Sequence, residues 1–198
     1  MRHAAALLPV LVLLGAAPAG EWTKYDERKG ATLEKRPVPG SSYNEFRATI
    51  ELPVDVAAAA AFIWSFATDP ASTKTVKKRA IKTTADEVVM YQQIFVPTVS
   101  DRDMTLRLFK VPPASDGTLE MRWEAASALG PAPEKGFVRM SEVRGSWTVK
   151  PLAGGKARIV FVTFSEPAGA IPAVFVRGPQ RDRAEVDFFS VVERLAKP

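Results

Sequence analysis

The sequence predicts an α+β domain in which a curved antiparallel sheet carries its helices on one face. Residues between about 44 and 164 mostly alternate apolar and polar side chains, which is typical of half-buried strands. An alanine-rich helix after Asp55 interrupts these strands. Apolar residues from Phe188 to Leu195 then have the i, i+3, i+4, i+7 spacing of an amphipathic helix. We therefore expect one long terminal helix across the sheet, and a sheet curved around a helix commonly leaves a cavity.

Residues 1–19 are typical of a secretory signal peptide. A basic start at Arg2 precedes an uncharged, Leu/Val-rich run over residues 4–17, and residues 17–19 (Ala-Pro-Ala) provide a small-x-small cleavage site. The alternative is a membrane anchor, but the run is shorter than the ~20 residues that a bilayer requires. No cysteine is present for a lipoprotein anchor. We expect a cleaved signal, export to the periplasm or secretion, and a single domain over residues 20–198.

The composition limits the chemistry. The net charge is +5, and loss of Arg2 with the signal leaves +4, a mild excess that does not indicate nucleic-acid binding. The single histidine is His3, inside the expected signal, and there is no cysteine. A mature chain without His or Cys excludes Ser-His-Asp and Cys-His nucleophiles and the usual zinc ligand sets. We expect a binding protein rather than an enzyme, with no catalytic residue, no metal site and no cofactor.

The first half of the mature chain contains strands and one helix. Strands are expected over residues 22–28, 31–38 and 44–53. Asp55 is a suitable N-cap for a helix over residues 56–66, and a short second helix is expected over residues 71–73. A basic run then comprises Lys74, Lys77, Lys78, Arg79 and Lys82. We interpret this run as a solvated face, with contact to anionic lipid headgroups as the alternative.

The second half is a series of strands followed by the last helix. Strands are expected over residues 87–96, 102–111, 118–125, 137–150 and 156–164. Residues 127–136 contain two prolines and two glycines and form an irregular loop. The last helix is expected over residues 171–195, with Pro172 in its first turn. Gly178-Pro179 interrupts this helix, because an internal proline costs ~3 kcal/mol, so we expect a kink and a hinge there.

Three segments resemble START-like proteins of bacteria. Residues 97–103 (Pro-Thr-Val-Ser-Asp-Arg-Asp) resemble that family's Pro-Val-Ser-Asp-Arg-Asp segment. Residues 144–147 (Arg-Gly-Ser-Trp) with Pro151 are similar to its Gly-x-Trp-x-apolar-x-Pro strand. Residues 166–173 (Glu-Pro-Ala-Gly-Ala-Ile-Pro-Ala) are similar to the Asp-Pro-Gly-Gly-x-Ile-Pro lead-in to its last helix, with one glycine lost. The segments follow the family's order and spacing, and the match spans residues 22–195.

The resemblance implies a helix-grip fold, in which a curved antiparallel sheet grips the C-terminal helix around a hydrophobic tunnel. Members bind one lipid, sterol or similar apolar molecule, and the loop over residues 127–136 together with the last helix would form a gate. The sterol-carrying branch places an acid and an arginine inside the tunnel. The matching positions here fall near Gln92 or Gln93 and near Leu108. We therefore expect a neutral polar or wholly apolar ligand end.

Apolar positions of the strands, the loop and the last helix are the candidate tunnel walls and gate. They are Ile94, Leu106, Leu108, Met121, Trp123, Leu129, Phe137, Trp147, Phe161, Ile171, Val174 and Phe175. For any single one of them, ordinary core packing is the alternative. Arg102 is expected in an ion pair that pins its turn, with ligand contact as the alternative. Glu166 is either an acid at the tunnel mouth or a carboxylate stabilised by the dipole of the following helix.

These observations predict an exported START-like protein that binds, and in one version transfers, a lipid or other apolar small molecule. We expect a monomer that contacts anionic membranes transiently and does not bind nucleic acid. The first alternative is an enzyme of the polyketide cyclase/dehydratase type, since some members of the wider superfamily have that activity. The second is a protein-interaction domain whose cavity has filled in.

Overall fold

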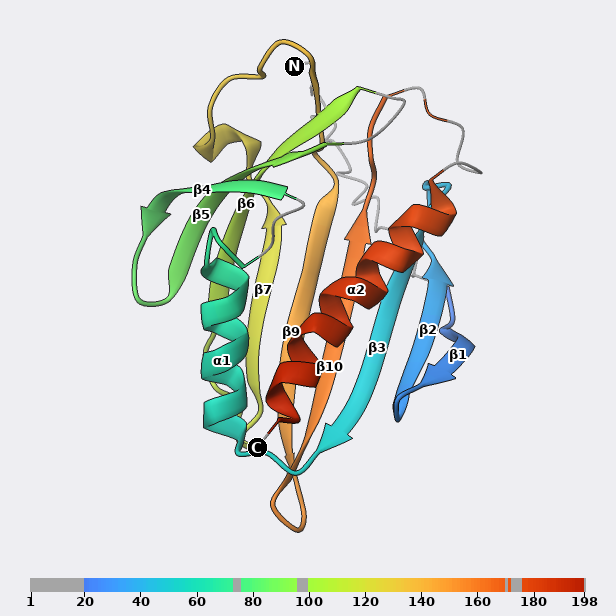
Figure 1. Ribbon diagram of the computed structural model, residues 1–198, viewed down its shortest axis with the longest axis vertical. Coiled ribbons are helices and arrows are strands. Elements are labelled where there is room, and N and C mark those ends of the chain that lie inside the picture. Colours follow the sequence, from blue (N-terminus) through green and yellow to red (C-terminus); the bar gives the residue numbers. More distant parts are fainter. Residues whose placement is uncertain (1–19, 73–75, 96–99, 170, 172–175, 198) are drawn as a thin grey trace, which may run out of the picture.

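The computed structural model describes residues 20–72, 76–95, 100–169, 171 and 176–197 (Figure 1). Its strands are β1 (Thr23–Arg28), β2 (Ala31–Pro37), β3 (Asn44–Leu52), β4 (Val76–Thr83), β5 (Glu87–Ile94), β6 (Asp101–Val111), β7 (Leu119–Ala125), β8 (Phe137–Arg139), β9 (Val143–Leu152) and β10 (Lys156–Ser165). Its helices are α1 (Val56–Thr68), the short 3-10 helix η1 (Ser127–Leu129) and α2 (Arg177–Leu195). Both α-helices lie on the same face of the sheet (Figure 1).

The strands form one open, curved sheet. Its order is β1-β2-β3-β10-β9-β7-β6-β5-β4, with antiparallel neighbours throughout, and β8 pairs in parallel with β6. The predicted α+β class and the curved antiparallel sheet with a C-terminal helix are confirmed. No helix in the described part of the chain is long and apolar enough to cross a membrane.

The main core lies between the middle of the sheet and α2. Ala48, Phe161 and Trp147 are cross-strand neighbours on β3, β10 and β9, so their side chains form one row on the same face. The ring of Trp147 lies 4.5 Å from that of Phe161 and 5.9 Å from that of Phe188 on α2. Phe188 is fully buried. The predicted apolar stripe of the last helix therefore packs on the predicted inner face of the sheet.

Helix α1 begins where the sequence predicts. The carboxylate of Asp55 accepts a hydrogen bond of 2.8 Å from the backbone N–H of Ala58, as an N-cap should. The short second helix expected over residues 71–73 is wrong for Ala71 and Ser72, which lie in a turn, while Thr73 lies outside the described residues. Asp69 explains the turn, because its carboxylate accepts from the backbone N–H of Ala71.

Two strands of the second half differ from the prediction. The basic run contains the edge strand β4, which is paired with β5 and was not predicted; Lys77, Arg79 and Lys82 are exposed there, as a solvated face requires, while Lys78 is half-buried. The strand was missed because three consecutive charged residues, Lys77, Lys78 and Arg79, hide the alternation of apolar and polar side chains. Lysines are common on edge strands, where they discourage pairing with other chains. The predicted strand over residues 137–150 is two strands, β8 and β9, because the chain leaves β6 after Arg139 and begins to pair with β7 and β10 only after Glu142.

The predicted kink in the last helix is wrong. Helix α2 begins at Arg177, so Gly178 and Pro179 lie in its first turn and not in its middle. The first backbone N–H groups of a helix have no acceptor within it, so a proline there removes no hydrogen bond. Residues 172–175 lie outside the described residues, and with them the predicted helix start at Pro172.

Candidate ligand-binding cavity

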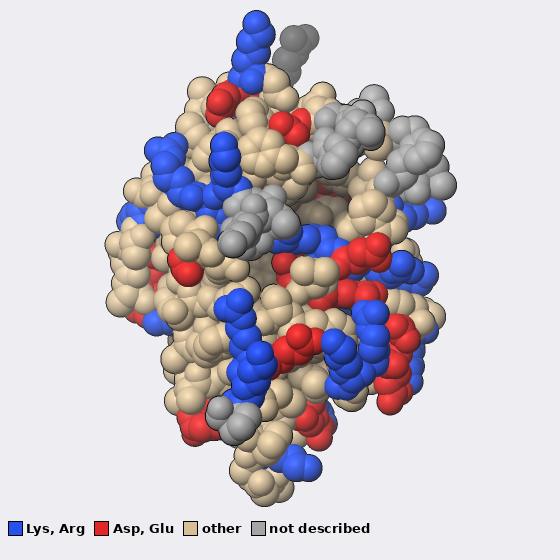
Figure 2. Space-filling model, in the orientation of Figure 1, with Lys and Arg blue, Asp and Glu red and all other residues tan. Residues whose placement is uncertain are grey.

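A cavity of about 900 Å³ lies between the inner face of the sheet and α2. Alternate residues of β6 line it (Arg102, Met104, Leu106 and Leu108), because successive strand residues point to opposite faces. One stripe of α2 closes the other side, with Gln180, Arg183, Ala184, Asp187 and Val191 at helical spacing. Figure 2 shows the surface hollowed beside the N-terminal half of this helix.

Most of the predicted wall residues that the structure describes do line this cavity. They are Ile94, Leu106, Leu108, Trp123, Trp147, Phe161 and Ile171. Trp123 reaches it because its neighbour on β9 is a glycine. A Cβ on Gly145 would lie 2.1 Å from the Trp123 ring, so only glycine leaves room for the indole to lie flat over the strand. The ring then stacks on Phe161 at 5.7 Å.

Three predicted wall residues lie elsewhere. Met121 is buried in the core, and α1 packs against its strand β7. Leu129 is 51% exposed on η1, and Phe137 packs edge-on against Phe95 with ring centroids 6.2 Å apart. None of the three lines the cavity. The predicted wall residues Val174 and Phe175 lie outside the described residues.

The loop over residues 127–136 does not supply any cavity wall, contrary to its expected place at a gate. It lies instead over the outward positions of β5 and β6. The backbone N–H of Ala126 donates to the carbonyl of Thr105, and Gly130 sits so close that a Cβ there would lie 1.8 Å from Thr105 Oγ1. Thr105 is consequently fully buried although it points away from the cavity.

A buried ion pair fixes this loop. Arg139 donates from Nε and Nη2 to the two carboxylate oxygens of Asp103, each at 2.7 Å, and from both Nη atoms to the carbonyl of Pro131. Tyr91 Oη donates to Asp103 at 2.9 Å. The hydrogen bond from Arg139 lowers the pKa of Asp103, and burial followed by the bond to Asp103 raises the pKa of Tyr91. This network is a structural clamp on the outer face.

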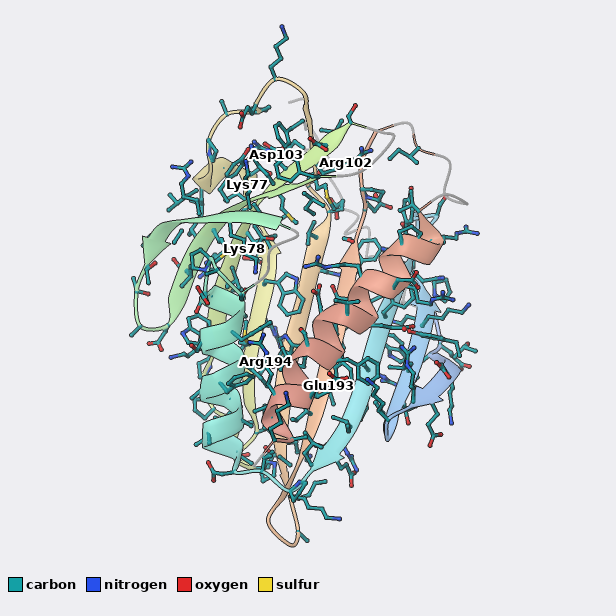
Figure 3. The ribbon with its side chains drawn as sticks, in the orientation of Figure 1. Lys77, Lys78, Arg102, Asp103, Glu193 and Arg194 are labelled. Atoms are coloured by element: carbon teal, nitrogen blue, oxygen red, sulfur yellow. The ribbon has the colours of Figure 1, made fainter. Side chains whose placement is uncertain are left out.

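The neighbouring Arg102 faces inward and holds the lead-in to α2 (Figure 3). Its Nε donates to the carbonyl of Pro167 at 3.1 Å, its Nη2 to the carbonyl of Ala168 at 3.3 Å, and its Nη1 to the carbonyl of Ser100. Arg102 therefore pins the turn through backbone carbonyls, where an ion pair was expected. Glu166 accepts a hydrogen bond from Ser41 and does not line the cavity.

Several polar cavity residues were not predicted. Lys78 of β4 and Gln92 of β5 are cross-strand neighbours that both line the cavity, and Arg183 and Asp187 face them from α2. Gln92 and Leu108 occupy the positions that the resemblance matched to an acid and an arginine, whereas the charged side chains come from β4, β6 and α2. The available signal was the spacing of Gln180, Arg183 and Asp187 along the apolar stripe, where polar residues are unusual.

No group of three or more His, Cys, Asp or Glu side chains among the described residues could hold a metal ion. The wall of the cavity is largely apolar and carries a few charged side chains. This is the common composition of a small-molecule binding site.

Comparisons with known proteins agree with this geometry. No family model matches the chain. An uncharacterized protein of Pseudomonas aeruginosa is 25% identical over 169 residues, which cover 83% of this chain and 81% of the relative.

Three solved structures have the same fold at low identity. The STAR-related lipid transfer protein from Xanthomonas axonopodis superposes with a TM-score of 0.75 at 23% identity, over 89% of this chain and 99% of that one. Human StAR-related lipid transfer protein 5 gives 0.65 at 19% identity, over 89% and 88%. An aromatase/cyclase from Streptomyces sp. R1128 gives 0.51 at 11% identity, over 76% and 92%. The open curved sheet with its terminal helix thus gives this chain the START-like helix-grip fold.

Proposed function

We propose that the protein binds one lipid or similarly apolar small molecule in the cavity between the sheet and α2. The observation that carries the proposal is the cavity itself: about 900 Å³ of space, lined mostly by apolar side chains, in a START-like fold. At about 30 Å³ for each water of the bulk liquid, this space equals roughly 30 waters. A filled interior, as in an interaction domain without a ligand, does not fit this volume.

The physical driving force is burial of apolar surface. Each methylene moved from water into an apolar site gains ~0.8 kcal/mol, so a chain of ten or more carbons supplies a large binding free energy. Two lipid transfer proteins share the fold, and their names support a hydrophobic ligand here. Transfer between membranes, in contrast to storage, is a further part of the proposal.

We also propose that the protein is exported as a monomer and touches anionic membranes. The signal-like sequence of residues 1–19 supports export. The exposed residues Lys77 and Arg79 of β4 support membrane contact, because basic side chains are attracted to anionic lipid surfaces. Phe95, 46% exposed, lies beside them with the Lys77 ammonium 5.1 Å from its ring.

The test is recovery and uptake of ligand. Native mass spectrometry of the purified protein, with lipid extraction, should identify one apolar molecule per chain, and the protein should take up a fluorescent lipid from vesicles. Ala184→Phe places a ring in the cavity and should reduce uptake strongly. Val186→Phe adds similar bulk on the solvent side of the same helix, where Val186 is 61% exposed, and should not. No recovered ligand and no uptake by the parent protein would count against the proposal.

A catalytic function on the same fold is the second candidate, supported by the aromatase/cyclase neighbour. A Tyr–Asp pair or two carboxylates converging in the cavity would favour it. The pair of Tyr91 and Asp103 lies outside the cavity, and Asp187 is the single carboxylate among the described lining residues. Turnover of a poly-β-ketone thioester that is lost in Asp187→Asn would establish this function; no turnover would exclude it for that substrate.

A further inference from the structure

The charged side chains that line the cavity carry an excess of positive charge. Of those that line it among the described residues, Lys78, Arg102 and Arg183 are cations, and Asp187 is the one carboxylate. A largely apolar cavity gains nothing from an excess of cations unless a ligand supplies the missing anion, because burying unpaired charge costs free energy. The composition of the wall therefore carries information about the ligand.

Lys78 is the cation with the fewest protein partners. It lies on the inner face of the edge strand β4, while its neighbour Lys77 on the same strand is exposed (Figure 3). Its ammonium has three donors, and among the described residues its one hydrogen-bond acceptor is Ser72 Oγ, at 3.0 Å. Burial lowers the pKa of Lys78, and the negative charges of Asp187 and Asp69 oppose this effect without forming an ion pair with the ammonium.

Arg183 and Asp187 complete this end of the cavity. They are one helical turn apart on α2, and their side chains form an ion pair with N–O distances of 3.0 Å. Both interact electrostatically with Lys78 across the gap between α2 and β4. Burial raises the pKa of Asp187, although its side chain remains 42% accessible because it faces the cavity. One carboxylate is thus placed between two cations and can neutralise one of them.

Arg102, the third cation of the cavity, holds the lead-in to α2. The guanidinium of Arg102 donates to three backbone carbonyls, which hold it in place but, being neutral, do not cancel its charge. It adds a favourable potential for an anion in the cavity.

We propose that the ligand is amphipathic and anionic, and that its carboxylate or phosphate head binds at Lys78, beside the pair of Arg183 and Asp187, with its apolar body along Trp123 and Phe161. The proposal rests on the proposed function and names the ligand's class. It also replaces the expectation of a neutral ligand end, which took into account only the positions near Gln92 and Leu108. Lys78 makes charge-assisted hydrogen bonds to the head, and Arg183 shares its charge between the head and Asp187.

The experiment is displacement of the neutral fluorescent probe N-phenyl-1-naphthylamine from the purified protein by matched ligands. Hexadecanoate is compared with hexadecanol, and dipalmitoyl phosphatidic acid with dipalmitoylglycerol and dipalmitoylphosphatidylcholine. Each anionic ligand should bind about 10-fold or more tightly than its uncharged or zwitterionic counterpart, which corresponds to one charge-assisted hydrogen bond. A preference among acids for hexadecanoate indicates a carboxylate head, and one for phosphatidic acid indicates a phosphate head.

Variants assign the effect to Lys78. Lys78→Gln should remove most of the preference for anionic ligands, about 10-fold or more, and leave hexadecanol unaffected. Lys82→Gln removes the same charge from an exposed position of the same strand, where the Lys82 side chain is 60% accessible, and should leave the preference intact. Lys78→Arg should restore it, which separates a charge effect from a folding defect. Asp187→Asn should strengthen binding of both anionic ligands, because it removes the one carboxylate that repels the head among the described lining residues.

The outcomes separate this proposal from the one on which it rests. If neutral or zwitterionic lipids bind as tightly as anionic ones, or if Lys82→Gln and Lys78→Gln behave alike, the anionic-head proposal is overturned and lipid binding stands. If none of the ligands displaces the probe or binds, both fail.

Discussion

Replacing Arg139 should destabilise the protein far more than replacing any arginine on its surface. Arg139→Met removes both hydrogen bonds to Asp103, whose side chain is 0% exposed, and leaves that carboxylate with Tyr91 as its side-chain donor. Removing one partner of a buried ion pair costs about 3–5 kcal/mol, because the remaining charge is neither solvated nor paired. For a domain of this size, that corresponds to a melting temperature lower by about 6–20 °C.

Arg122 provides a matched control. It also forms a two-bonded pair, with Glu120, at 2.7 and 3.2 Å, but its side chain is 54% exposed. Arg122→Met should therefore cost less than about 1 kcal/mol. The measurement is urea unfolding at pH 7, followed by fluorescence and circular dichroism, with the difference read from the midpoints at constant m-value. Equal losses in the two variants would refute the reasoning.

The pH dependence of unfolding is an independent test of whether the stabilisation by Arg139 is ionic. Because the pKa of Asp103 is lowered in the folded protein, the unfolded chain binds the proton more readily. The stabilisation by Arg139 is then fully present above the unfolded pKa of ~3.9 and is lost as the pH falls through the folded value. The difference between the parent protein and Arg139→Met should be constant near neutral pH and should shrink below about pH 4. A difference that persists unchanged in acid would contradict an ionic origin.

Three further substitutions test local features by urea unfolding. Gly145→Ala should cost about 1–3 kcal/mol, because a Cβ there lies 2.1 Å from the ring of Trp123, and the near-ultraviolet circular dichroism of that ring should change as well. Ala168→Gly should stabilise by about 1 kcal/mol, because Ala168 has φ +55° in the left-handed region that disfavours a Cβ. Asp55→Ala should cost about 1 kcal/mol through loss of the α1 cap. The opposite sign in any of these would contradict its stated cause.

Arg102 and Asp103 show which features of a residue can be predicted from the sequence and which cannot. Their motif was recognised, and strand alternation predicts that the two side chains point to opposite faces. Their partners could not be predicted, because Arg102 contacts the carbonyl of Pro167 and Asp103 contacts Arg139, 65 and 36 residues away. One residue holds the lead-in to α2 and the other holds the loop on the outer face. An ion pair within the turn was the natural local expectation for both.

The loop over residues 127–136 shows the same limit. Its irregular composition was predicted from two prolines and two glycines, but nothing in those ten residues says which face of the sheet they cover. The loop covers the outer face because it packs against Thr105 and Asp103, which point outward from β6. The wall residues Leu106, Leu108 and Trp123 were predicted because they belong to regular strands whose inner face is apolar.

The sequence by itself determined most of the strands, the two long helices and which face of each is apolar, since these are properties of neighbouring residues. That was enough for the α+β class, the cap at Asp55 and much of the cavity wall. Only the tertiary structure decided that Gly178-Pro179 begins α2, and that Lys78, Arg183 and Asp187 meet at one end of the cavity. The physical reason is that pairing between distant elements, not local periodicity, sets which side chains share a low-dielectric space.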